Sequence, residues 1–169
     1  HLHVSIQSLD DKILKLMKRN YRAEFVVGLL KKVQEEVPDS AITADIITGF
    51  PQEEEENFWN TFENMKKINF SDFHIFPYSD REKTAAAAFT GKIEPEVKKE
   101  RVKILEKLKK SKIKEFREKF LDTVQKVYIE EIKAGKAYGY TENYLRVEVN
   151  SVSHKVADIV EVKIMSSAG

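Results

Sequence analysis

The chain contains no cysteine among its 169 residues, and it has only six glycines and four prolines. Without cysteine it can form no disulfide bond, thiolate metal site or cysteine-bound iron–sulfur cluster of its own. No hydrophobic run approaches the roughly 18 residues that a membrane-spanning helix needs, so we expect no membrane partner. A hydrophobic fraction of 41% and a net charge of +1 exclude a disordered chain and a uniformly basic, nucleic-acid-coating protein.

Residues 1–7 alternate between polar and apolar side chains from the first position onward. This is the pattern of a β-strand with two unlike faces. Folded domains seldom begin inside a strand, and the first residue is not methionine. We therefore interpret the sequence as a piece of a longer protein.

The first 80 residues predict strands and helices in alternation. Strands are expected at 2–6, 41–48 and 73–76, each followed or preceded by residues with helical spacing. The consecutive glutamates Glu53 to Glu56 suit a helix N-terminus, where unpaired N–H groups carry partial positive charge. Strands separated by helices form parallel sheets with right-handed crossovers, so this half is predicted to be α/β.

The second half of the chain changes its pattern twice. Residues 81–91 are expected to be loop and partial helix, and a long helix is predicted from Pro95 to about Phe120. From Lys92 to Lys119 there are 12 basic and 6 acidic residues, which suits a solvated helix face or contact with a nucleic-acid backbone. Residues 124–129, 144–149 and 156–164 then alternate like strands, with turns at Gly135 and Gly139. We expect a small antiparallel barrel that leans on the α/β part.

Polar side chains on the predicted parallel strands indicate a binding face. If the apolar residues of the first strand face the helices, its polar residues must point the other way. Closed barrels normally fill their interior with apolar side chains, so polar ones predict a ligand-holding lumen near the C-terminal strand ends. The alternative is a polar face that simply meets solvent. The residues on this face are His3, Ser5 and Gln7, then Thr43 and Asp45, then His74 and Phe76.

Histidines and a carboxylate on this face leave a second chemistry open. His1, His3, Asp45 and His74 could ligate a divalent metal, whose activated water would then hydrolyse a substrate. Two histidines two positions apart on a strand arise often by chance, so the pattern has low specificity. We keep a metal-dependent hydrolase as an alternative function.

Four motifs, in order along the chain, resemble the radical S-adenosylmethionine methylthiotransferases. The first three are similar to the fourth, fifth and sixth barrel strands of that family, and the last to its TRAM RNA-binding domain. The resemblance implies an α/β fold in which residues 1–120 are the C-terminal portion of a partial parallel (βα) barrel. Residues 121–169 would be a small antiparallel all-β, OB-like TRAM domain. The motifs are His3-Val4-Ser5-Ile6-Gln7-Ser8 with the segment Leu14 to Tyr21, then Asp45 to Glu53, His74 to Ala86, and Gly139 to Leu145.

The tail and the missing cysteines refine what the resemblance implies. Gly139-Tyr140-Thr141-Glu142-Asn143-Tyr144 is similar to the branch that adds a methylthio group to carbon 2 of N6-threonylcarbamoyladenosine, beside the anticodon of tRNA. The family uses S-adenosylmethionine and two 4Fe-4S clusters, whose cysteine loops precede a strand like 2–6. The chain alone lacks those ligands and is expected to be inactive. Its implied partners are tRNA, S-adenosylmethionine and the missing N-terminal half of the same enzyme, in the cytoplasm.

Departures from the family pattern fall in turns. Leu9 and Gln52 stand where the family has glycine, and Ala85 where it has proline. These substitutions affect loop geometry more than the proposed polar contacts.

The resemblance also implies two sets of site residues, and no metal ligand. Neutral donors and a guanidinium suit the ribose and methionyl carboxylate of S-adenosylmethionine, and glycine lets a ligand approach the backbone. Aromatic rings can stack on unpaired bases while cations meet phosphates. Alternatives are a helix C-terminal charge for Arg19, a core role for Tyr144, and a free-standing RNA-binding module for the whole chain. The first set is Ser5, Gln7, Arg19, Gly49, Phe76 and Pro77, with Asp45 and His74 as weaker candidates; the RNA-binding set is Lys133, Lys136, Tyr138, Tyr140, Asn143, Tyr144 and Arg146.

Overall fold

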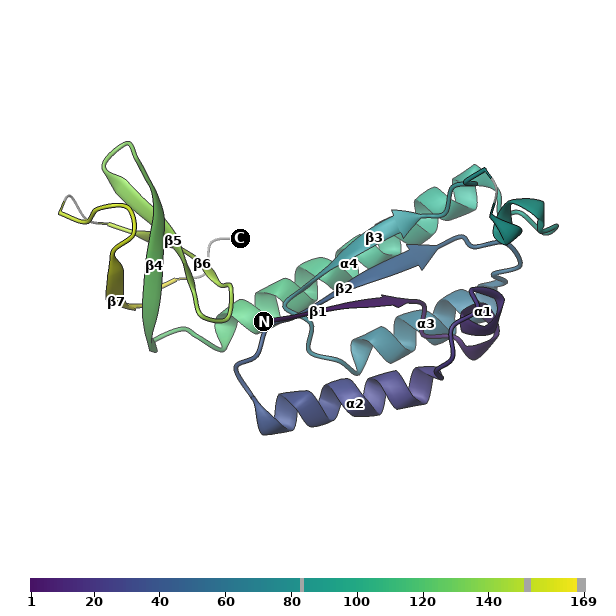
Figure 1. Ribbon diagram of the computed structural model, residues 1–169, viewed down its shortest axis with the longest axis horizontal. Helices are drawn as coiled ribbons and strands as arrows, with labels where there is room; N and C mark the ends of the chain where they lie inside the picture. The colour runs from purple at the N-terminus through teal and green to yellow at the C-terminus, as the bar shows by residue number, and fades with distance from the viewer. Residues whose placement is uncertain (83, 151–152, 167–169) are drawn as a thin grey trace.

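Two β-sheets joined by one long helix make up the computed structural model, which describes residues 1–82, 84–150 and 153–166 (Figure 1). The first sheet is parallel, with strand order β1-β2-β3. The second is antiparallel, with order β6-β5-β4-β7. We refer to residues 1–120 as the α/β part and to residues 121–166 as the β tail.

The α/β part confirms the predicted alternation of strands and helices. Its elements are β1 (Leu2–Gln7), α1 (Asp11–Leu16), α2 (Ala23–Glu36), β2 (Ile42–Thr48), α3 (Glu55–Lys66), β3 (Asp72–Pro77), a 3-10 turn η1 (Ala85–Ala88) and α4 (Pro95–Glu118). Figure 1 shows α2 and α3 on one side of the sheet, and α4 running along β3 toward the β tail.

Local sequence signals explain where the short helix α1 begins and ends. Asp10 accepts a hydrogen bond from the Ile13 amide at 3.0 Å, the usual role of an N-cap carboxylate. At the other end Lys18 takes a positive φ of 56°, and the Arg19 amide donates to the Leu14 carbonyl at 2.9 Å. This is a Schellman-type ending with lysine in the position that glycine usually occupies. The chain turns at Lys18, and Arg19 is the first residue after this turn.

The core of the α/β part lies between the sheet and its helices. Alternate residues of β2 are fully buried, including Ile42 and Ile46 at 0% exposure. Phe73 of β3 is also at 0%, and Leu105 brings α4 into the same cluster. The opposite residues of each strand stay exposed or half-buried. The apolar period of the sequence therefore decides which face the helices cover.

The β tail contains four strands where the sequence predicted three. They are β4 (Val124–Lys133), β5 (Lys136–Thr141), β6 (Arg146–Val149) and β7 (Ile159–Lys163). The prediction of a turn at Gly139 is wrong, because this residue lies inside β5, where a Cβ would collide with the Tyr128 carbonyl. Gly135 does occupy the β4–β5 turn, with φ 76°. Antiparallel pairing is confirmed, but the ladders of the described residues include none between β6 and β7 that would close a barrel.

A small apolar cluster joins the two parts. Phe116 and Phe120, at the end of α4, pack with Ala41 and with Leu145 of the tail. Nearby, the side-chain amide of Asn143 donates to the Asp39 carbonyl at 3.0 Å. The tail thus rests on the end of α4 and the start of β2, as its small size predicted.

Across the residues described, no helix combines the length and hydrophobicity that crossing a membrane requires.

Candidate functional site

Polar side chains on the uncovered face of the parallel sheet bond to one another across the strands. Asp45 Oδ2 accepts from Ser5 Oγ at 3.3 Å and lies 3.2 Å from His3 Nε2. The other His3 ring nitrogen lies 2.9 Å from Thr43 Oγ1. The structure therefore brings these residues together on one face, as predicted.

This face is open rather than enclosed. The side chains of His3 and Asp45 are 42% and 23% exposed, and His74 and Phe76 on β3 are exposed. The three strands of this sheet leave the face open in the described residues, so the expected lumen is not formed by this chain alone and stays a prediction. The polar face that meets solvent, the alternative given above, is what this chain forms.

Gln7 departs from the predicted row. The pairing of β1 with β2 shifts between Val4 and Gln7, so that Gln7 pairs with Ile46 of the buried row. Gln7 is also in the left-handed region, with φ 69°. Such a bulge turns a side chain away from strict alternation. Placing Gln7 in one row with His3 and Ser5 is therefore wrong, although it still stands at the C-terminal end of β1.

The C-terminal ends of β2 and β3 lie side by side. Thr48 pairs with Pro77, and the Tyr78 amide donates to the Thr48 carbonyl at 2.8 Å. Gly49 follows directly, with φ 76°, and a Cβ there would collide with the Lys98 side chain of α4. Gly49 is thus favoured by its backbone angle, independently of any ligand, and a larger residue would also have to displace the Lys98 side chain.

A buried ion pair holds the turn after β2. Glu53 Oε2 accepts from the Gly49 amide and from Arg101 Nη1, each at 2.6 Å, and Arg101 also donates to the Glu53 carbonyl at 3.0 Å. The Arg101 and Glu53 side chains are only 9% and 2% exposed. Burial raises the pKa of Glu53, while the Gly49 amide and Arg101 act to lower it. The pair fixes the turn 49–53 against α4.

The role of Glu53 corrects one sequence prediction. Glu54 is the N-cap of α3 and shares a capping box with Asn57, and Glu55 and Glu56 lie in the first turn, as expected for acidic residues. Glu53 instead points back into its own turn. Sequence reasoning missed Arg101 because 48 residues separate it from its partner, and its neighbours in α4 read as a predominantly basic, solvated helix face.

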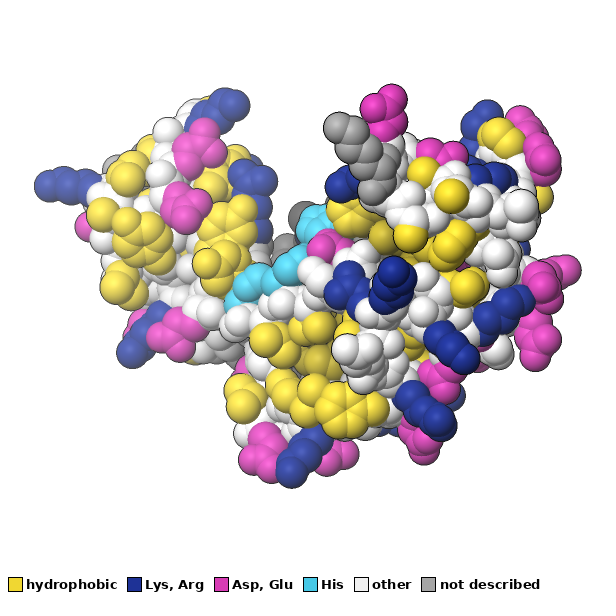
Figure 2. Space-filling view, turned by 45° about the vertical axis from the view of Figure 1, so that its right-hand side comes forward, with side chains coloured by type: hydrophobic (Ala, Val, Ile, Leu, Met, Phe, Trp, Pro, Cys, Tyr) yellow, Lys and Arg dark blue, Asp and Glu magenta, His cyan; other side chains and the backbone are white. Residues whose placement is uncertain are grey.

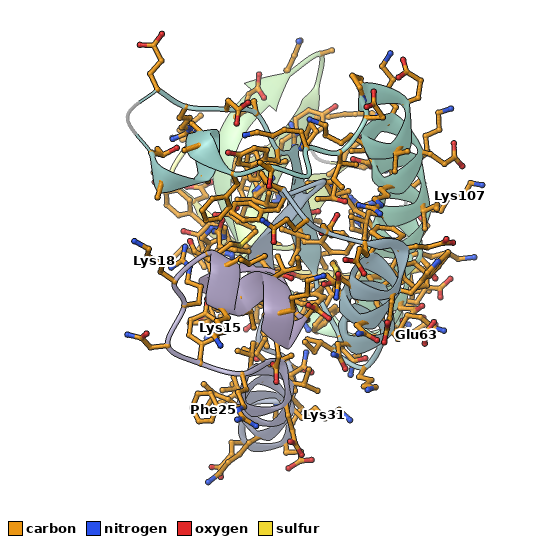
Figure 3. All side chains as sticks on the ribbon, turned by 90° about the vertical axis from the view of Figure 1, so that its right-hand side faces the viewer. Lys15, Lys18, Phe25, Lys31, Glu63 and Lys107 are labelled. Carbon is orange, nitrogen blue, oxygen red and sulfur yellow. The ribbon has the colours of Figure 1, made fainter. Side chains whose placement is uncertain are left out.

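Arg19 lies in the connection between α1 and α2. Tyr21, two residues on, donates from its hydroxyl to the Ile6 carbonyl at 3.1 Å, which ties this segment to the strand. Arg19 lines a surface hollow with Lys15 and Phe25, among other residues. Figure 3 shows Lys15 beside α1 and Phe25 pointing outward from α2. Arg19 therefore follows a helix C-terminus and comes two residues before the tyrosine that bonds to the end of β1, so both of its predicted roles stay open.

The tail gathers most of its predicted RNA-binding residues on one face. Cross-strand pairing puts Lys133 opposite Lys136 and Tyr140 opposite Arg146, with Tyr138 between them on β5. The Arg146 guanidinium lies 5.7 Å from the centre of the Tyr138 ring, and Lys136 pairs with Glu148. The opposite face holds the tail's core residues Val127, Ile129 and Ala137. An outer face with aromatic rings and both basic and acidic side chains is thus present.

Two further tail residues have distinct positions. Asn143 is engaged in holding the tail to Asp39, so its amide has a structural partner. Tyr144 is 64% exposed and adopts φ 63° in the turn before β6, so the core role considered for it is wrong. Its ring centre lies 4.5 Å from that of His1.

Several basic side chains of helix α4 contact other parts of the chain instead of facing solvent. Lys112 donates to the Lys66 carbonyl at 2.9 Å, Lys109 pairs with Asp72, and Arg101 is buried.

Within the described ranges, no group of three or more His, Cys, Asp or Glu side chains is arranged to hold a metal ion. His3 bonds with Asp45 and Thr43 instead, so nothing favours the hydrolase alternative.

Sequence comparisons show which known proteins this chain is similar to. Residues 1–65 match the profile of the Radical SAM superfamily. The chain is 37% identical, over 99% of its length, to a threonylcarbamoyladenosine tRNA methylthiotransferase of Bacillus subtilis, and 36% identical, again over 99%, to a tRNA-2-methylthio-N(6)-dimethylallyladenosine synthase of Aquifex aeolicus. It spans 38% of the length of each relative. Across nearly its whole length the chain is therefore similar to radical S-adenosylmethionine tRNA methylthiotransferases.

Proposed function

We propose that the chain is the C-terminal part of a tRNA methylthiotransferase that modifies carbon 2 of N6-threonylcarbamoyladenosine. The observation that carries this proposal is its 37% identity, across 99% of its residues, to an enzyme named for that substrate. In this proposal residues 1–120 complete the radical S-adenosylmethionine barrel and residues 121–169 form a TRAM RNA-binding domain.

The uncovered edge of the parallel sheet supports the idea of a missing preceding half. In the described part of the chain β1 pairs only with β2, whereas parallel sheets are normally larger and buried on both faces. Beside this edge α2 exposes Phe25 at 62% and Leu29 at 48%. A preceding strand and helix of the same enzyme would cover both.

The residues at the strand ends fit half of an S-adenosylmethionine site. Ser5, Arg19, Phe76 and Pro77 are all exposed, and the first two offer a hydroxyl and a guanidinium to a carboxylate or ribose. Gln7 and Gly49 stand at the adjoining ends of β1 and β2. When bound and reduced in such enzymes, this cofactor supplies a 5′-deoxyadenosyl radical. The residues of this chain would hold and orient it.

The two 4Fe-4S clusters of the family do not fit this chain. With no cysteine in the sequence, it offers no thiolate to hold them. We therefore expect the isolated chain to release no 5′-deoxyadenosine when it is incubated with S-adenosylmethionine and dithionite. Liquid chromatography of the reaction mixture measures this product. Release at the rate of a complete enzyme would overturn this part of the proposal.

The substrate branch needs its own experiment, because relatives named for two different adenosine modifications match almost equally well. The full-length gene would be expressed in a bacterial strain lacking both methylthiotransferases, and its tRNA nucleosides analysed by mass spectrometry. We expect the methylthio form of threonylcarbamoyladenosine. Finding only the methylthio form of dimethylallyladenosine would refute the branch while leaving the family intact.

The outer face of the tail is proposed to bind tRNA. Combined Tyr138→Ala and Arg146→Ala substitutions remove a ring and its covering guanidinium from this face. We expect tRNA affinity, measured by filter binding, to fall by about tenfold or more. Lys32→Ala on α2 is a control that removes an exposed charge away from this face. Unchanged affinity in the double variant would exclude this face.

A further inference from the structure

Six rings form a continuous series from the β tail onto the polar face of the parallel sheet. Centre-to-centre distances are 6.0 Å from Tyr140 to Tyr144, 4.5 Å from Tyr144 to His1, 6.0 Å from His3 to His74 and 6.4 Å from His74 to Phe76. The one gap in the series, between His1 and His3, is bridged by Thr43, whose hydroxyl lies 3.1 Å from His1 Nε2 and 2.9 Å from His3 Nδ1. We call Tyr140, Tyr144, His1, His3, His74 and Phe76 the ring series.

The ring series is accessible. Tyr144 is 64% exposed and Phe76 49%, and His1, His3 and His74 are exposed as well. Figure 2 shows histidine side chains gathered at the hollow between the two parts of the molecule. Large rings left uncovered in a row, rather than folded into a core, present their faces to a ligand.

The placement of the series is fixed by contacts outside it. Leu145, next to Tyr144, is buried against Phe116 and Phe120, and Asn143 bonds to Asp39 just before β2. These contacts hold the tail turn against the start of the sheet. The rings of the two parts therefore meet because the fold holds them there.

The chemistry of the series selects unpaired nucleotides. Rings stack on bases of any identity, and imidazoles also exchange hydrogen bonds with base edges. The carboxylate of Asp45, between His3 and Ser5, suits an exocyclic amino group and disfavours a phosphate. Cations lie at the tail end, where Arg146 is paired with Tyr140 across the strands. Bases would thus lie on the rings with the phosphates directed toward the tail's cations.

We infer that the ring series is a binding site for single-stranded RNA, leading unpaired nucleotides from the β tail across the sheet toward the C-terminal ends of its strands. The inference rests on the proposed function, because a tRNA-modifying site must receive a base taken out of its stack. It adds the sheet histidines to the RNA contact surface, which otherwise consists of the tail alone.

The test measures the binding of a fluorescein-labelled octa-adenylate RNA to the 169-residue chain by anisotropy. Tyr144→Ala and His74→Ala should each weaken binding by about tenfold, since each removes one stacking face. His74→Phe should restore binding, because it keeps a ring at that position. Matched controls are Phe25→Ala on α2 and His154→Ala in the β6–β7 connection, which should change affinity less than about twofold; thermal melting checks that every variant folds.

Two results would overturn the inference. If Tyr144→Ala weakens binding and His74→Ala does not, RNA contacts the tail only, and the proposed function stands without the ring series. If His74→Phe binds as poorly as His74→Ala, the position does not act by stacking. The nucleoside analysis of the full-length enzyme is independent of both results, so failure of the proposed function itself would be recognised separately.

Discussion

The α/β part and the β tail differ most in the apolar surface that each buries. Among the described residues, the main cluster of the α/β part holds 16 buried side chains, whereas the tail's own cluster holds only Val127, Ile129 and Ala137. In the tail Tyr128 is 46% exposed and Ile159 71%. A sheet with so few buried side chains depends on its neighbour, and its uncovered rings are free to bind a ligand.

The two parts also use charge differently. The α/β part buries the Glu53–Arg101 pair at the end of β2, where nearby donors and acceptors satisfy it. In the tail the Lys136–Glu148 pair is half exposed to water. A buried pair cannot lose one member without leaving the other uncompensated, whereas an exposed pair can. Removing one member of the buried pair should therefore lower the unfolding free energy much more than removing one member of the exposed pair.

The largest effect is expected for Glu53→Ala. Removing the carboxylate leaves Arg101 buried without its counter-charge and frees the Gly49 turn, which should cost about 4 kcal/mol of unfolding free energy. Urea denaturation followed by tryptophan fluorescence measures it, because Trp59 lies in α3, which follows this turn. Glu56→Ala, an exposed neighbour, is the control and should change the free energy by less than about 0.5 kcal/mol. Equal effects of the two would contradict the role of the buried pair.

Phe120→Ala should break the connection between the parts. Its ring is 2% exposed and packs against Phe116 in the joining cluster. We expect a loss of about 3 kcal/mol and separate melting of the tail, seen as a second transition in calorimetry. Phe25→Ala, whose ring is 62% exposed, should leave one transition. A single transition in Phe120→Ala would show that the tail is held by other contacts.

Gly139→Ala should damage the tail alone. The added Cβ would meet the Tyr128 carbonyl, a backbone atom that cannot move without distorting β4. We expect a loss of about 2 kcal/mol confined to tail amides in hydrogen exchange. Gly28→Ala in α2 is the matched control, since nothing lies within 4 Å of its added methyl group. That control should stabilise the chain slightly.

The smallest effect concerns the exposed pair of the tail. A hydrogen bond from Lys136 lowers the pKa of Glu148 below its usual 4.5. The stability it contributes is therefore present above that pH and is lost as the pH falls through the lowered pKa. Urea midpoints of the chain and of Glu148→Gln should differ slightly near neutral pH and converge in acid. A difference that grows on acidification would reverse the sign of this linkage.

Most of the α/β part could be predicted because its sequence patterns agree with one another. The apolar period identifies all three strands and their buried face, and the cap at Asp10 marks a helix start. Gln7 could not be placed, because a bulge in the pairing of β1 with β2 depends on the whole sheet and leaves no local signal. The same limit applies to Arg101, whose partner Glu53 is distant in sequence.

The tail was harder to predict for a physical reason. A glycine in a short strand reads as a turn, and only the neighbouring strand reveals that Gly139 is needed where the Tyr128 carbonyl approaches closely. Of the candidate site, the shared face of Ser5, Asp45 and His74 followed from alternation alone. The meeting of Tyr144 with His1 did not, because it depends on how the tail rests on α4.

The anchorage of the tail at one end of the parallel sheet has a practical consequence. Asp39 and Ala41, which receive the tail, precede β2, whereas Gly49 and Pro77 stand at the far ends of β2 and β3. Loops inserted after Pro77 could be lengthened or exchanged without detaching the tail. One residue added between Val37 and Ala41 would disturb the contacts that Asp39 and Ala41 make with the tail. Attempts to change what the protein binds should therefore leave that short connection unaltered.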